Sequence, residues 1–477
     1  MVSKVFEGTN VEIPAVLANR DRRVATQAQL LREHPSQVVV ACKLNIPGPV
    51  KNSAAIQAFF TAGLARLEDQ WLACGQPFEI ATSWEDAPTG PERFYLLYSA
   101  GVTVKEGTVH FEERQPANRL FDLDVLITNG GESHSLSRGD FDLPVRTCLI
   151  CGRPAKECGR SRRHSVEELQ ARVAKLIDEA TAANQRETVA EQLADQAVKA
   201  MLNEVVTWPK PGLVDPVEHR AHPDMDVFTF IQSATSLRPY FKRAATAGLN
   251  FPTVQPAPLF FNQLRLLGQR AETTMFKATA GVNTHKGTIF SLGILTGAVA
   301  TLKGRQLPVT QLNVQRVVKE MLANLLATDL DGLKHGQQLT AGERQYLAYG
   351  QTGIRGEAAS GFPTVFKYGL PTWRANWGMN QNDRQLTTFL KIARHTDDTT
   401  LVKRAGDPAI LAWKDQQLDR FFELGGLTTK QGRQFLVNLE KDFSDRHLSL
   451  GGAADLLIAT IFLASVMEGD NDHGTKD

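Results

Sequence analysis

The pattern of apolar residues changes once along this chain, near residue 180, and the change limits the folds that the chain can adopt. Before that point, β-branched and aromatic runs of strand length alternate with amphipathic stretches of helical period. Beyond it, strand signals nearly vanish and one helical pattern follows another. We therefore predict a mixed α/β N-terminal domain over residues 1–182, an all-α C-terminal domain over 187–477, and a linker at 181–186.

Individual elements follow from the same periodicities. Strands are predicted at 37–44, 94–98 and 120–127, and N-terminal helices at 53–74 and 167–183. In the second domain the predicted helices are 187–207, 228–247, 259–278, 314–328, 384–393, 409–424, 429–443 and 453–467.

Charge and cysteine content exclude several classes of protein. The 477 residues carry a formal net charge of +1, which gives no global attraction to nucleic acid or to an anionic membrane. The N-terminus has no apolar signal region, and the longest apolar run, 456–467, is too short to span a bilayer. Of the five cysteines, three lie between 148 and 158, which favours a reducing compartment over a disulfide framework. We expect a cytoplasmic protein that binds neither nucleic acid nor membrane.

Asp122 and Asp124 stand two positions apart in a predicted strand, so their side chains should lie on one face. Two carboxylates flanked by apolar residues are costly unless a cation neutralises them. Mg²⁺ takes such oxygen ligands and keeps room for a phosphate, as nucleotidyl transfer requires. The pair favours a nucleotidyltransferase-like site in the first domain. An acidic strand face in water would give the same pattern.

Two further N-terminal motifs contain candidate ligands. The stiff turn at 45–53 carries Lys51, which could hold a phosphate or could simply precede a capped helix. Downstream, the spacing C-x2-C-x6-C-x5-H offers four ligands for tetrahedral Zn²⁺, with reduced cysteines in a loop as the alternative. These ligands are Cys148, Cys151, Cys158 and His164. Basic residues in the same segment would stabilise thiolates or bind phosphates, and they are Arg160, Arg162 and Arg163.

The loop 279–288 joins a predicted helix to an almost wholly apolar run, 289–302. It places the polar side chains of Asn283, His285 and Lys286 between two glycines, Gly281 and Gly287. Glycines let a backbone approach a ligand closely, and the start of a buried helix offers free N–H groups to an anion. The order Lys-Gly-Thr is not that of a P-loop. A turn before a core helix is the alternative interpretation.

Several other polar motifs lie at the starts of apolar helices, at 209–215, 222–226, 396–400 and 451–455, and a glycine-bounded loop follows 355. Their charged or ionisable residues are Lys210, Asp215, His222, Asp224, Asp226, Arg355, Glu357, Asp397, Asp398, Arg404 and Asp455. Singly, each acid is typical of a helix N-cap. Together they indicate a shared polar centre.

These motifs resemble two known enzyme families, and the resemblance covers nearly the whole chain. The first domain resembles apo-citrate lyase phosphoribosyl-dephospho-CoA transferase (holo-citrate lyase synthase) through LNIPGPVKN at 44–52, RLFDLDV at 119–125 and RTCLICGRPAKECGRSRRHS at 146–165. The second resembles triphosphoribosyl-dephospho-CoA synthase through PKPGLVD at 209–215, HPDMD at 222–226, NQLRLLGQRAETTMFKATAGVNTHKGTIFSLG at 262–293, RGEAASGFPTV at 355–365, DDT at 397–399 and GGAADLL at 451–457.

The resemblance implies two consecutive reactions in one bifunctional chain. The second domain would join ATP and 3′-dephospho-CoA into 2′-(5″-triphosphoribosyl)-3′-dephospho-CoA and release adenine. The first domain would transfer the phosphoribosyl-dephospho-CoA group to a serine of the citrate lyase acyl carrier subunit and release pyrophosphate.

It also implies roles for the candidate residues. Displacement of adenine from ribose needs a base and an acid around an oxocarbenium-like state, for which the candidates are His222, Asp224 and Asp226. Asp397 and Asp398 would hold Mg²⁺ on the triphosphate, and Lys210, Lys286 and Arg404 would contact phosphates. Asn283 and His285 would orient ribose or base. The remaining substrate-binding candidates are Asp215, Gly281, Gly287, Arg355, Glu357 and Asp455. In the first domain Asp122 and Asp124 would hold Mg²⁺, with Lys51 or Arg119 on the pyrophosphate.

The main alternative is a metal-dependent N-glycoside hydrolase of the ADP-ribosyl type, in which water replaces the 2′-hydroxyl as acceptor. It would be fused to a zinc-bearing interaction module. Adenine release that depends on dephospho-CoA distinguishes the synthase from this alternative.

Overall fold

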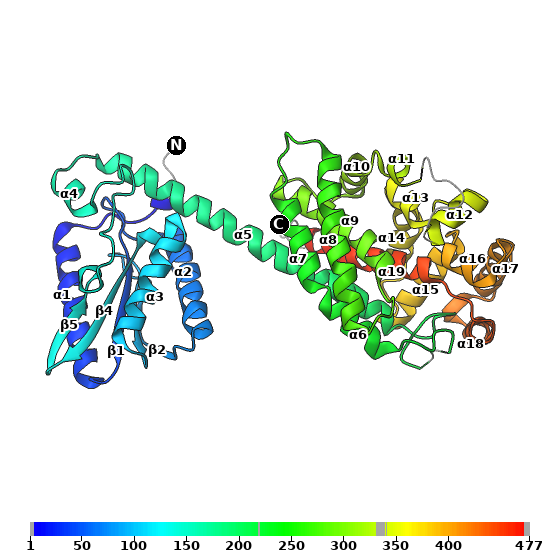
Figure 1. The fold of residues 1–477 in the computed structure, drawn as a ribbon, viewed down its shortest axis with the longest axis horizontal. Helices are drawn as coiled ribbons and strands as arrows, with labels where there is room; N and C mark the ends of the chain where they lie inside the picture. Colours follow the sequence, from blue (N-terminus) through cyan, green and yellow to red (C-terminus); the bar gives the residue numbers. More distant parts are fainter. Residues whose placement is uncertain (1–3, 218–219, 331–338, 340, 472–477) are drawn as a thin grey trace. The chain divides into compact units, whose positions relative to one another are not determined.

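The computed structural model describes residues 4–217, 220–330, 339 and 341–471. The chain forms two compact units, Met1–Gln185 and Arg186–Asp477 (Figure 1). Each unit has a hydrophobic core of its own, and each is described separately.

The N-terminal unit is built on one small antiparallel sheet of order β2-β3-β1-β4-β5. Its strands are β1 (Val38–Leu44), β2 (Phe78–Trp84), β3 (Glu92–Leu97), β4 (Phe121–Asn129) and β5 (Glu132–Leu136). Its helices are α1 (Ile13–Glu33), α2 (Ala54–Ala73), α3 (Gly101–Arg114), α4 (Ala155–Arg160) and the first part of α5 (Val166–Val205), with single-turn 3₁₀ helices at Lys4–Phe6, Pro116–Leu120 and Arg138–Phe141. The mixed character of this unit is confirmed, and a nucleotidyltransferase-like fold stays a prediction.

The two faces of the sheet have different partners because side chains alternate along each strand. In β1, Val40 and Cys42 face a core formed with α2, α3 and α5, whereas Val39 and Ala41 face α1. Figure 1 shows α1 on one side of the strands and α2 and α3 on the other. In β4 Phe121, Leu123 and Val125 point into the larger core, so Asp122 and Asp124 lie together on the α1 face, as Leu126 does.

The boundary between the two units, between Gln185 and Arg186, falls inside the predicted linker 181–186, and this segment is helical because α5 runs unbroken through it. The segment Thr-Ala-Ala-Asn-Gln-Arg contains no glycine or proline, and alanine, glutamine and arginine favour helix. Val173 and Ile177 of α5 are buried in the N-terminal core, whereas Leu193 and Met201 are buried in the core of the second unit. The two halves of the helix therefore differ in the core that buries them, although the helix itself is continuous.

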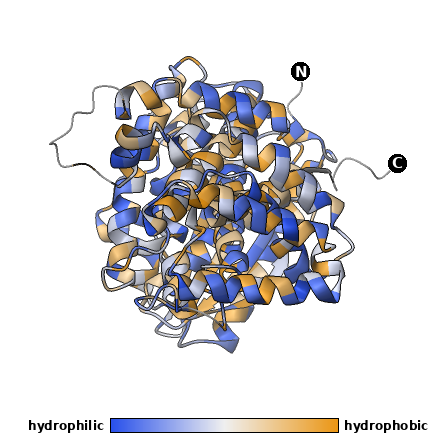
Figure 2. Cartoon of the chain, turned by 90° about the vertical axis from the view of Figure 1, so that its right-hand side faces the viewer, coloured by the Kyte–Doolittle hydropathy of each residue, from blue (hydrophilic) through white to orange (hydrophobic). Residues whose placement is uncertain are grey.

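Within the described residues the second unit contains no strand, which confirms its helical character. After the second part of α5 its helices are α6 (Val227–Ser236), α7 (Arg238–Leu249), α8 (Ala257–Ala278), α9 (Lys286–Gly304), α10 (Gln311–Met321), α11 (Leu325–Asp329), α12 (Ala341–Tyr349), α13 (Gly353–Ala359), α14 (Leu370–Ala375), α15 (Gln381–Arg394), α16 (Thr399–Ala405), α17 (Ile410–Glu423), α18 (Lys430–Asp445) and α19 (Gly451–Asn471), with a π turn at Val365–Gly369 and a 3₁₀ turn at Gly426–Thr428. Helices visible in Figure 2 carry both hydrophilic and hydrophobic residues, as amphipathic helices do. The predicted helix 228–247 is two helices, since α6 ends before Leu237 and Pro239 lies in the first turn of α7.

Helix α9 lies at the centre of this unit, where it packs against α7, α8, α10 and α19. Its small residues permit close approach: a Cβ on Gly293 would meet the hydroxyl of Tyr240, and one on Gly297 would meet Leu264. Helix α9 and the segment Gly451–Glu468 of α19 are long and apolar enough to cross a membrane, yet 78% and 67% of their apolar windows are buried in the protein. Core helices of soluble proteins have the same properties, and a cytoplasmic location stays a prediction.

Candidate active sites

A polar cavity of about 400 Å³ lies in the helical unit, where segments distant in the sequence meet. The start of α9, the start of α19, α16 and the loops before α6 and α9 all contribute to its wall. The predicted site residues that line it are His222, Asp224, Asn283, His285, Lys286, Gly287, Arg404 and Asp455. The shared polar centre expected from the sequence is therefore present.

Asp455 is a partly buried acid in the wall of this cavity. It lies in the first turns of α19, and its Oδ1 accepts a hydrogen bond of 2.5 Å from the Thr288 hydroxyl. Burial raises the pKa of Asp455 to about 7, against the smaller opposing effect of the Thr288 bond. Its Oδ2 lies against Gly287, where a Cβ would come within 2.0 Å. A carboxyl group with a pKa near neutrality can both accept and donate a proton.

His222 is buried, with hydrogen-bond acceptors at one ring nitrogen and a donor at the other. Its Nε2 lies 3.2 Å from both the carbonyl oxygen of Gly212 and the hydroxyl of Ser449, and its Nδ1 accepts from Arg404 at 3.1 Å. Burial lowers the pKa of His222, and the charge of Arg404 lowers it further. The ring is therefore neutral, with Nε2–H donating and Nδ1 accepting. Both nitrogens are occupied by protein groups.

His285 has one nitrogen without a partner. Its Nδ1 lies 2.7 Å from the Ser233 hydroxyl, which in turn accepts from Thr284 at 2.7 Å, whereas its buried Nε2 has no hydrogen-bond partner among the described residues. Burial lowers the pKa of His285 to about 3, with a smaller contribution from Lys210. When Thr284 donates to Ser233 and Ser233 donates to Nδ1, the ring proton resides on Nε2. His285, which lines the cavity, then has a neutral, buried N–H without a partner among the described residues.

The loop before α9 presents cations and amides at the cavity. Lys286 is half-exposed and forms a 2.8 Å ion pair with Glu272, and its backbone N–H donates to Asn283 at 3.3 Å. Gly281 has φ of +91°, a left-handed conformation that favours glycine, and it does not line the cavity. Lys403 and Arg404 of α16 add positive charge on the facing wall.

A buried ion pair lies beneath the cavity. The Nζ of Lys210 donates to the Oε1 of Glu204 at 2.5 Å and to the Glu204 carbonyl at 2.6 Å, and Asp215 accepts from the Lys210 N–H at 3.2 Å. Lys210, predicted to contact phosphate, is thus committed to Glu204. Glu204 itself lines the cavity, and no motif marks it in the sequence because the residue lies inside a long helix.

Asp226 and Asp398 have capping roles. Asp226 accepts from the N–H of Thr229 at 2.8 Å and caps α6. Asp398 is buried, and its two oxygens accept N–H groups of Thr400, Leu401 and Ala453 at 2.9 to 3.2 Å. Burial raises the pKa of Asp398, against these bonds. Asp397 is exposed and does not line the cavity.

A second cavity of about 580 Å³ adjoins the first, because Lys286 and Gly287 line both. Its wall is largely apolar, with Arg355 and Arg265 at one side, and both arginines bind Asp329, at 3.1 and 2.7 Å. Glu357 lies outside both cavities, where it accepts from the N–H and hydroxyl of Thr364, and burial raises its pKa.

In the N-terminal unit Asp122 and Asp124 share one strand face, as predicted, and both have cationic partners. Asp124 Oδ2 accepts from Arg23 of α1 at 2.9 Å. Asp122 lies 3.2 Å from Arg146 and 3.5 Å from Lys43. Each acid is about one-third exposed, 34% and 39% respectively.

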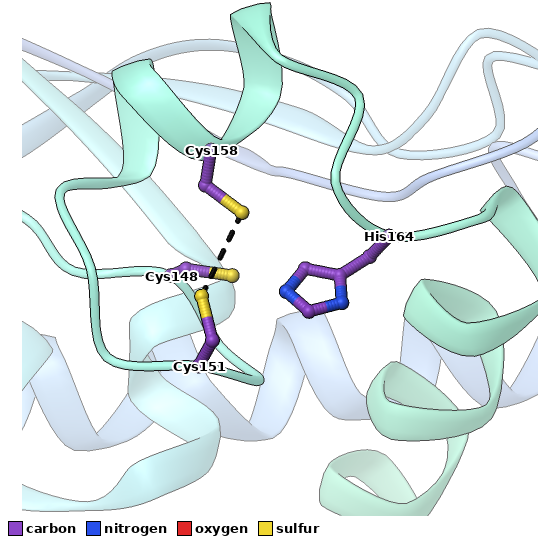
Figure 3. Close-up of side chains that lie close together, drawn as sticks. All are labelled: Cys148, Cys151, Cys158 and His164. Carbon is purple, nitrogen blue, oxygen red and sulfur yellow. Dashed lines mark hydrogen bonds between the residues drawn. The ribbon is translucent and has the colours of Figure 1, made fainter.

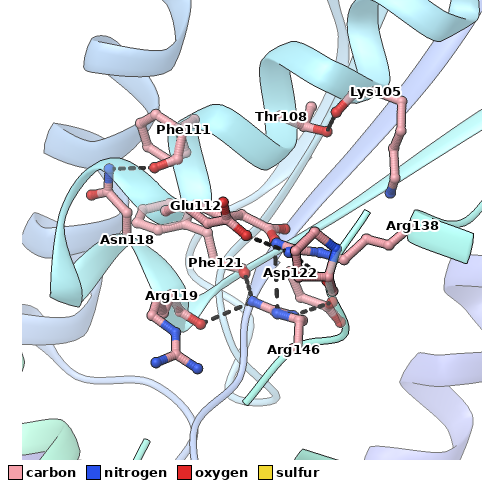
Figure 4. A network of polar contacts seen from close by, with 12 residues as sticks. Lys105, Thr108, Phe111, Glu112, Asn118, Arg119, Phe121, Asp122, Arg138 and Arg146 are labelled. Carbon is pink, nitrogen blue, oxygen red and sulfur yellow. Dashed lines mark hydrogen bonds and ion pairs between the residues drawn. The ribbon is translucent and has the colours of Figure 1, made fainter. Parts of the chain in front are cut away.

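Arg146 connects this acidic face to a polar network around α3 (Figure 4). It donates to the carbonyls of Arg119 and Phe121 at 2.9 and 2.6 Å, and it lies 3.7 Å from Glu112. Lys51 is turned away from the acids, since its Nζ donates to the Ile46 carbonyl at 2.6 Å, and burial lowers its pKa.

The four predicted zinc ligands converge. Their ligand atoms all lie within 4.8 Å of one another, and Figure 3 shows the three sulfurs and the His164 ring facing a common point. The Sγ atoms of Cys151 and Cys158 are 3.8 Å apart, and Cys148 Sγ accepts from the N–H of Ile150 at 3.5 Å. The Nε2 of His164 is buried and has no hydrogen-bond partner in the described part of the chain, and its Nδ1 lies 3.8 Å from Glu168.

Comparison with known families places both units. Residues 11–180 match the family described as apo-citrate lyase phosphoribosyl-dephospho-CoA transferase, and residues 190–474 match the family described as ATP:dephospho-CoA triphosphoribosyl transferase. Relatives that join both parts include Protein CitXG of Leuconostoc mesenteroides subsp. cremoris, 41% identical over 97% of this chain and 99% of the relative, and Protein CitXG of Haemophilus influenzae, 34% identical over 96% and 97%. A probable 2-(5″-triphosphoribosyl)-3′-dephosphocoenzyme-A synthase of Lactiplantibacillus plantarum is 49% identical over 57% of this chain and 95% of its own length.

The two matches define a two-part transferase. The chain belongs to the fused family in which an apo-citrate lyase phosphoribosyl-dephospho-CoA transferase precedes an ATP:dephospho-CoA triphosphoribosyl transferase. It is an enzyme of citrate lyase prosthetic group biosynthesis, as the sequence motifs predicted. The hydrolase alternative finds no support in these matches.

Proposed function

We propose that residues 1–182 and 187–477 form two catalytic domains with separate sites, and that the 400 Å³ cavity is the synthase site for ATP and 3′-dephospho-CoA. The observation that carries this assignment is the convergence of one carboxyl of raised pKa, one neutral imidazole and three cationic side chains in the lining of a single cavity. Displacement of adenine from ribose needs these groups: a base for the attacking hydroxyl, a donor for the leaving purine and positive charge for the triphosphate.

In this proposal Asp455 accepts the proton of the 2′-hydroxyl of dephospho-CoA as that oxygen bonds to ribose C1 of ATP. The bond from C1 to adenine N9 breaks, the neutral His285 ring stabilises the leaving purine by a hydrogen bond and keeps its own proton, and the purine takes its proton from water while Asp455 returns its proton to solvent. Arg404 and Lys286 bind the triphosphate. His222 positions Arg404 through the 3.1 Å bond to its Nδ1 and makes no contact of its own with substrate. This role replaces the expected one of general base.

The acids proposed to hold Mg²⁺ fit a metal unequally. Asp398 has both oxygens occupied by backbone N–H groups, so no step is assigned to a metal there. In the N-terminal unit Asp124 has one oxygen outside its Arg23 bond, and both acids are partly exposed. Asp122 and Asp124 would hold Mg²⁺, which neutralises charge on the phosphates when bound.

The N-terminal unit would then act as the carrier transferase. The serine oxygen of the acyl carrier attacks the α-phosphorus of the triphosphoribosyl group, the bond to the β-phosphate oxygen breaks, pyrophosphate leaves, and the hydroxyl proton passes to water. Arg119, which adjoins Asp122 through Arg146, would contact the leaving group. The carrier subunit is the implied protein partner.

The convergent cysteines and histidine would hold a structural Zn²⁺. A tetrahedral site with Zn–S bonds of about 2.3 Å separates its sulfurs by about 3.8 Å, which is the distance between Cys151 and Cys158. The unpartnered Nε2 of His164 supplies the fourth ligand, and Glu168 faces its other nitrogen, as carboxylates do behind zinc-bound histidines. All four positions are filled by protein, which is typical of a structural site.

One assay tests the synthase assignment. The protein is mixed with ATP, 3′-dephospho-CoA and Mg²⁺, and free adenine is measured by chromatography. Adenine release that requires dephospho-CoA is expected. Release without dephospho-CoA would identify a hydrolase, and no release would refute the assignment of the cavity.

A further inference from the structure

A third cavity, of about 530 Å³, lies in the N-terminal unit between the cysteine cluster and the start of β4. Its volume is within the range of small-molecule sites. Cys148, Cys158 and His164 form one wall, and the other polar residues on its surface include Asn45, Arg119, Arg146 and Arg162. Three guanidinium groups therefore border one enclosed space.

The three arginines differ in their partners. Arg146 is bound by Asp122 and the carbonyls of β4, so its charge is already matched. Neither Arg119 nor Arg162 has a carboxylate within ion-pair distance among the described residues, and Arg119 donates only to the carbonyl and hydroxyl of Thr147. Burial lowers the pKa of Arg119, and the neighbouring charges of Arg146 and Arg138 lower it further. The cavity holds unmatched positive charge.

Arg162 is held there by an unusual backbone. Its φ of +46° lies in the left-handed region, which a side chain as large as arginine rarely adopts. Such conformations persist where the surrounding structure enforces them, often at ligand sites. The turn at Arg162 is closed by hydrogen bonds from the N–H of Arg162 to the Gly159 carbonyl at 3.3 Å and from the N–H of Arg163 to the Cys158 carbonyl at 3.4 Å. Cys158 and His164, two residues after Arg162, are predicted metal ligands, so the turn is part of the cysteine cluster.

We propose that this cavity binds the diphosphate that leaves during carrier modification, that Arg162 and Arg119 are its ligands, and that the zinc cluster positions Arg162. Guanidinium groups bind phosphate oxygens with planar, charge-assisted hydrogen bonds. Arg146 links this cavity to Asp122, so the diphosphate lies beside the acids that would hold Mg²⁺. The inference rests on the proposed transferase function of the N-terminal unit.

The test measures binding of inorganic pyrophosphate to the full chain by isothermal titration calorimetry, with zinc content checked in every sample. Arg162→Ala and Arg119→Ala should each weaken binding about tenfold to a hundredfold, since each removes charge-assisted bonds to phosphate. Arg163→Ala is the matched control, because Arg163 is an exposed arginine of the same segment that does not line the cavity. It should bind like the wild type. Adenine release, which belongs to the other unit, should be unchanged in all three variants.

Three outcomes decide the inference. Unchanged pyrophosphate affinity in Arg162→Ala and Arg119→Ala, with normal carrier labelling by the wild type, overturns it and leaves the transferase function intact. Failure of the wild type to label the carrier refutes the transferase function instead. If the arginine variants lose affinity for 3′-dephospho-CoA and keep it for pyrophosphate, the cavity binds the other diphosphate of the reaction, and the leaving-group assignment is overturned. Cys151→Ser should lose zinc and pyrophosphate affinity together.

Discussion

Asp455→Asn keeps the size of the side chain and removes an ionisable group from the interior of the helical unit. Burial raises the pKa of Asp455 from 3.8 to about 7. Between these two values the unfolded chain loses its proton while the folded chain keeps it, so the wild type loses stability as the pH rises, and the whole loss is present above the folded pKa. The asparagine amide can still accept from Thr288 and lie against Gly287.

The size of the effect follows from the shift. At 1.36 kcal/mol per pKa unit, the ionised carboxylate costs the folded state about 4 kcal/mol. The free energy of unfolding of Asp455→Asn should therefore exceed that of the wild type by about 2 kcal/mol near pH 5 and by about 4 kcal/mol near pH 8. If Asp455 also accepts the hydroxyl proton, the same variant should lose adenine release by about a hundredfold or more in kcat.

Urea unfolding followed by circular dichroism gives the first quantity, and chromatography of adenine gives the second. Asp442→Asn, which changes an exposed acid of α18, is the matched control and should alter neither. A variant no more stable than the wild type near pH 8 would refute the burial of an ionised carboxylate. A variant with wild-type kcat would refute the proton transfer. If Asp455 had only a structural role, its replacement would lower both stability and activity, whereas we expect higher stability and lower activity.

Three other changes probe the rest of the molecule. Lys210→Met breaks the buried pair with Glu204 and should lower the free energy of unfolding by about 3 to 5 kcal/mol, measured by urea unfolding; adding Glu204→Gln should restore part of this loss, and a loss below 1 kcal/mol would show that the pair is solvated. Asp122→Asn should abolish labelling of the acyl carrier while adenine release continues; loss of both activities would contradict two separate sites. Purified protein should contain about one zinc per chain by elemental analysis, and Cys151→Ser should contain far less; metal-free wild type would leave reduced cysteines in a loop.

Three of the five strands in the described residues, β1, β3 and β4, and most long helices could be predicted because their apolar residues repeat with a clear period. The strands β2 and β5, few of whose residues are buried, and the helix α1 were not predicted. The strands 37–44 and 120–127 agree with β1 and β4 to within two residues at each end. The unit boundary lies inside the predicted linker, but the helical conformation of that segment could not be predicted, since only the three-dimensional structure shows that Ile177 and Leu193 lie on one helix and enter different cores. The break at Leu237 was missed because Pro239 fits the first turn of a helix and leaves the periodicity intact.

The convergence of the candidate residues could be predicted, but their partners could not. Motif composition identified His222, Arg404 and Asp455 as neighbours of one polar centre, and they line one cavity. Sequence gives no access to which hydrogen bonds a side chain has already formed. For that reason Lys210 and Asp398 were assigned to phosphate and metal, whereas the structure commits them to Glu204 and to backbone N–H groups.

Gly287 shows how two distant motifs form one feature. As part of a glycine-flanked loop, Gly287 is interpreted from the sequence as a position where the backbone could approach a phosphate closely. The φ of Gly287 does not lie in the left-handed region, so the backbone conformation does not require a glycine there. The requirement comes from Asp455, whose Oδ2 would lie 2.0 Å from any Cβ at this position, and whose Oδ1 is held by Thr288, the next residue. The glycine admits the carboxylate and the threonine orients it, so the start of α9 and the start of α19 together place one partly buried acid in the cavity that His285 also lines.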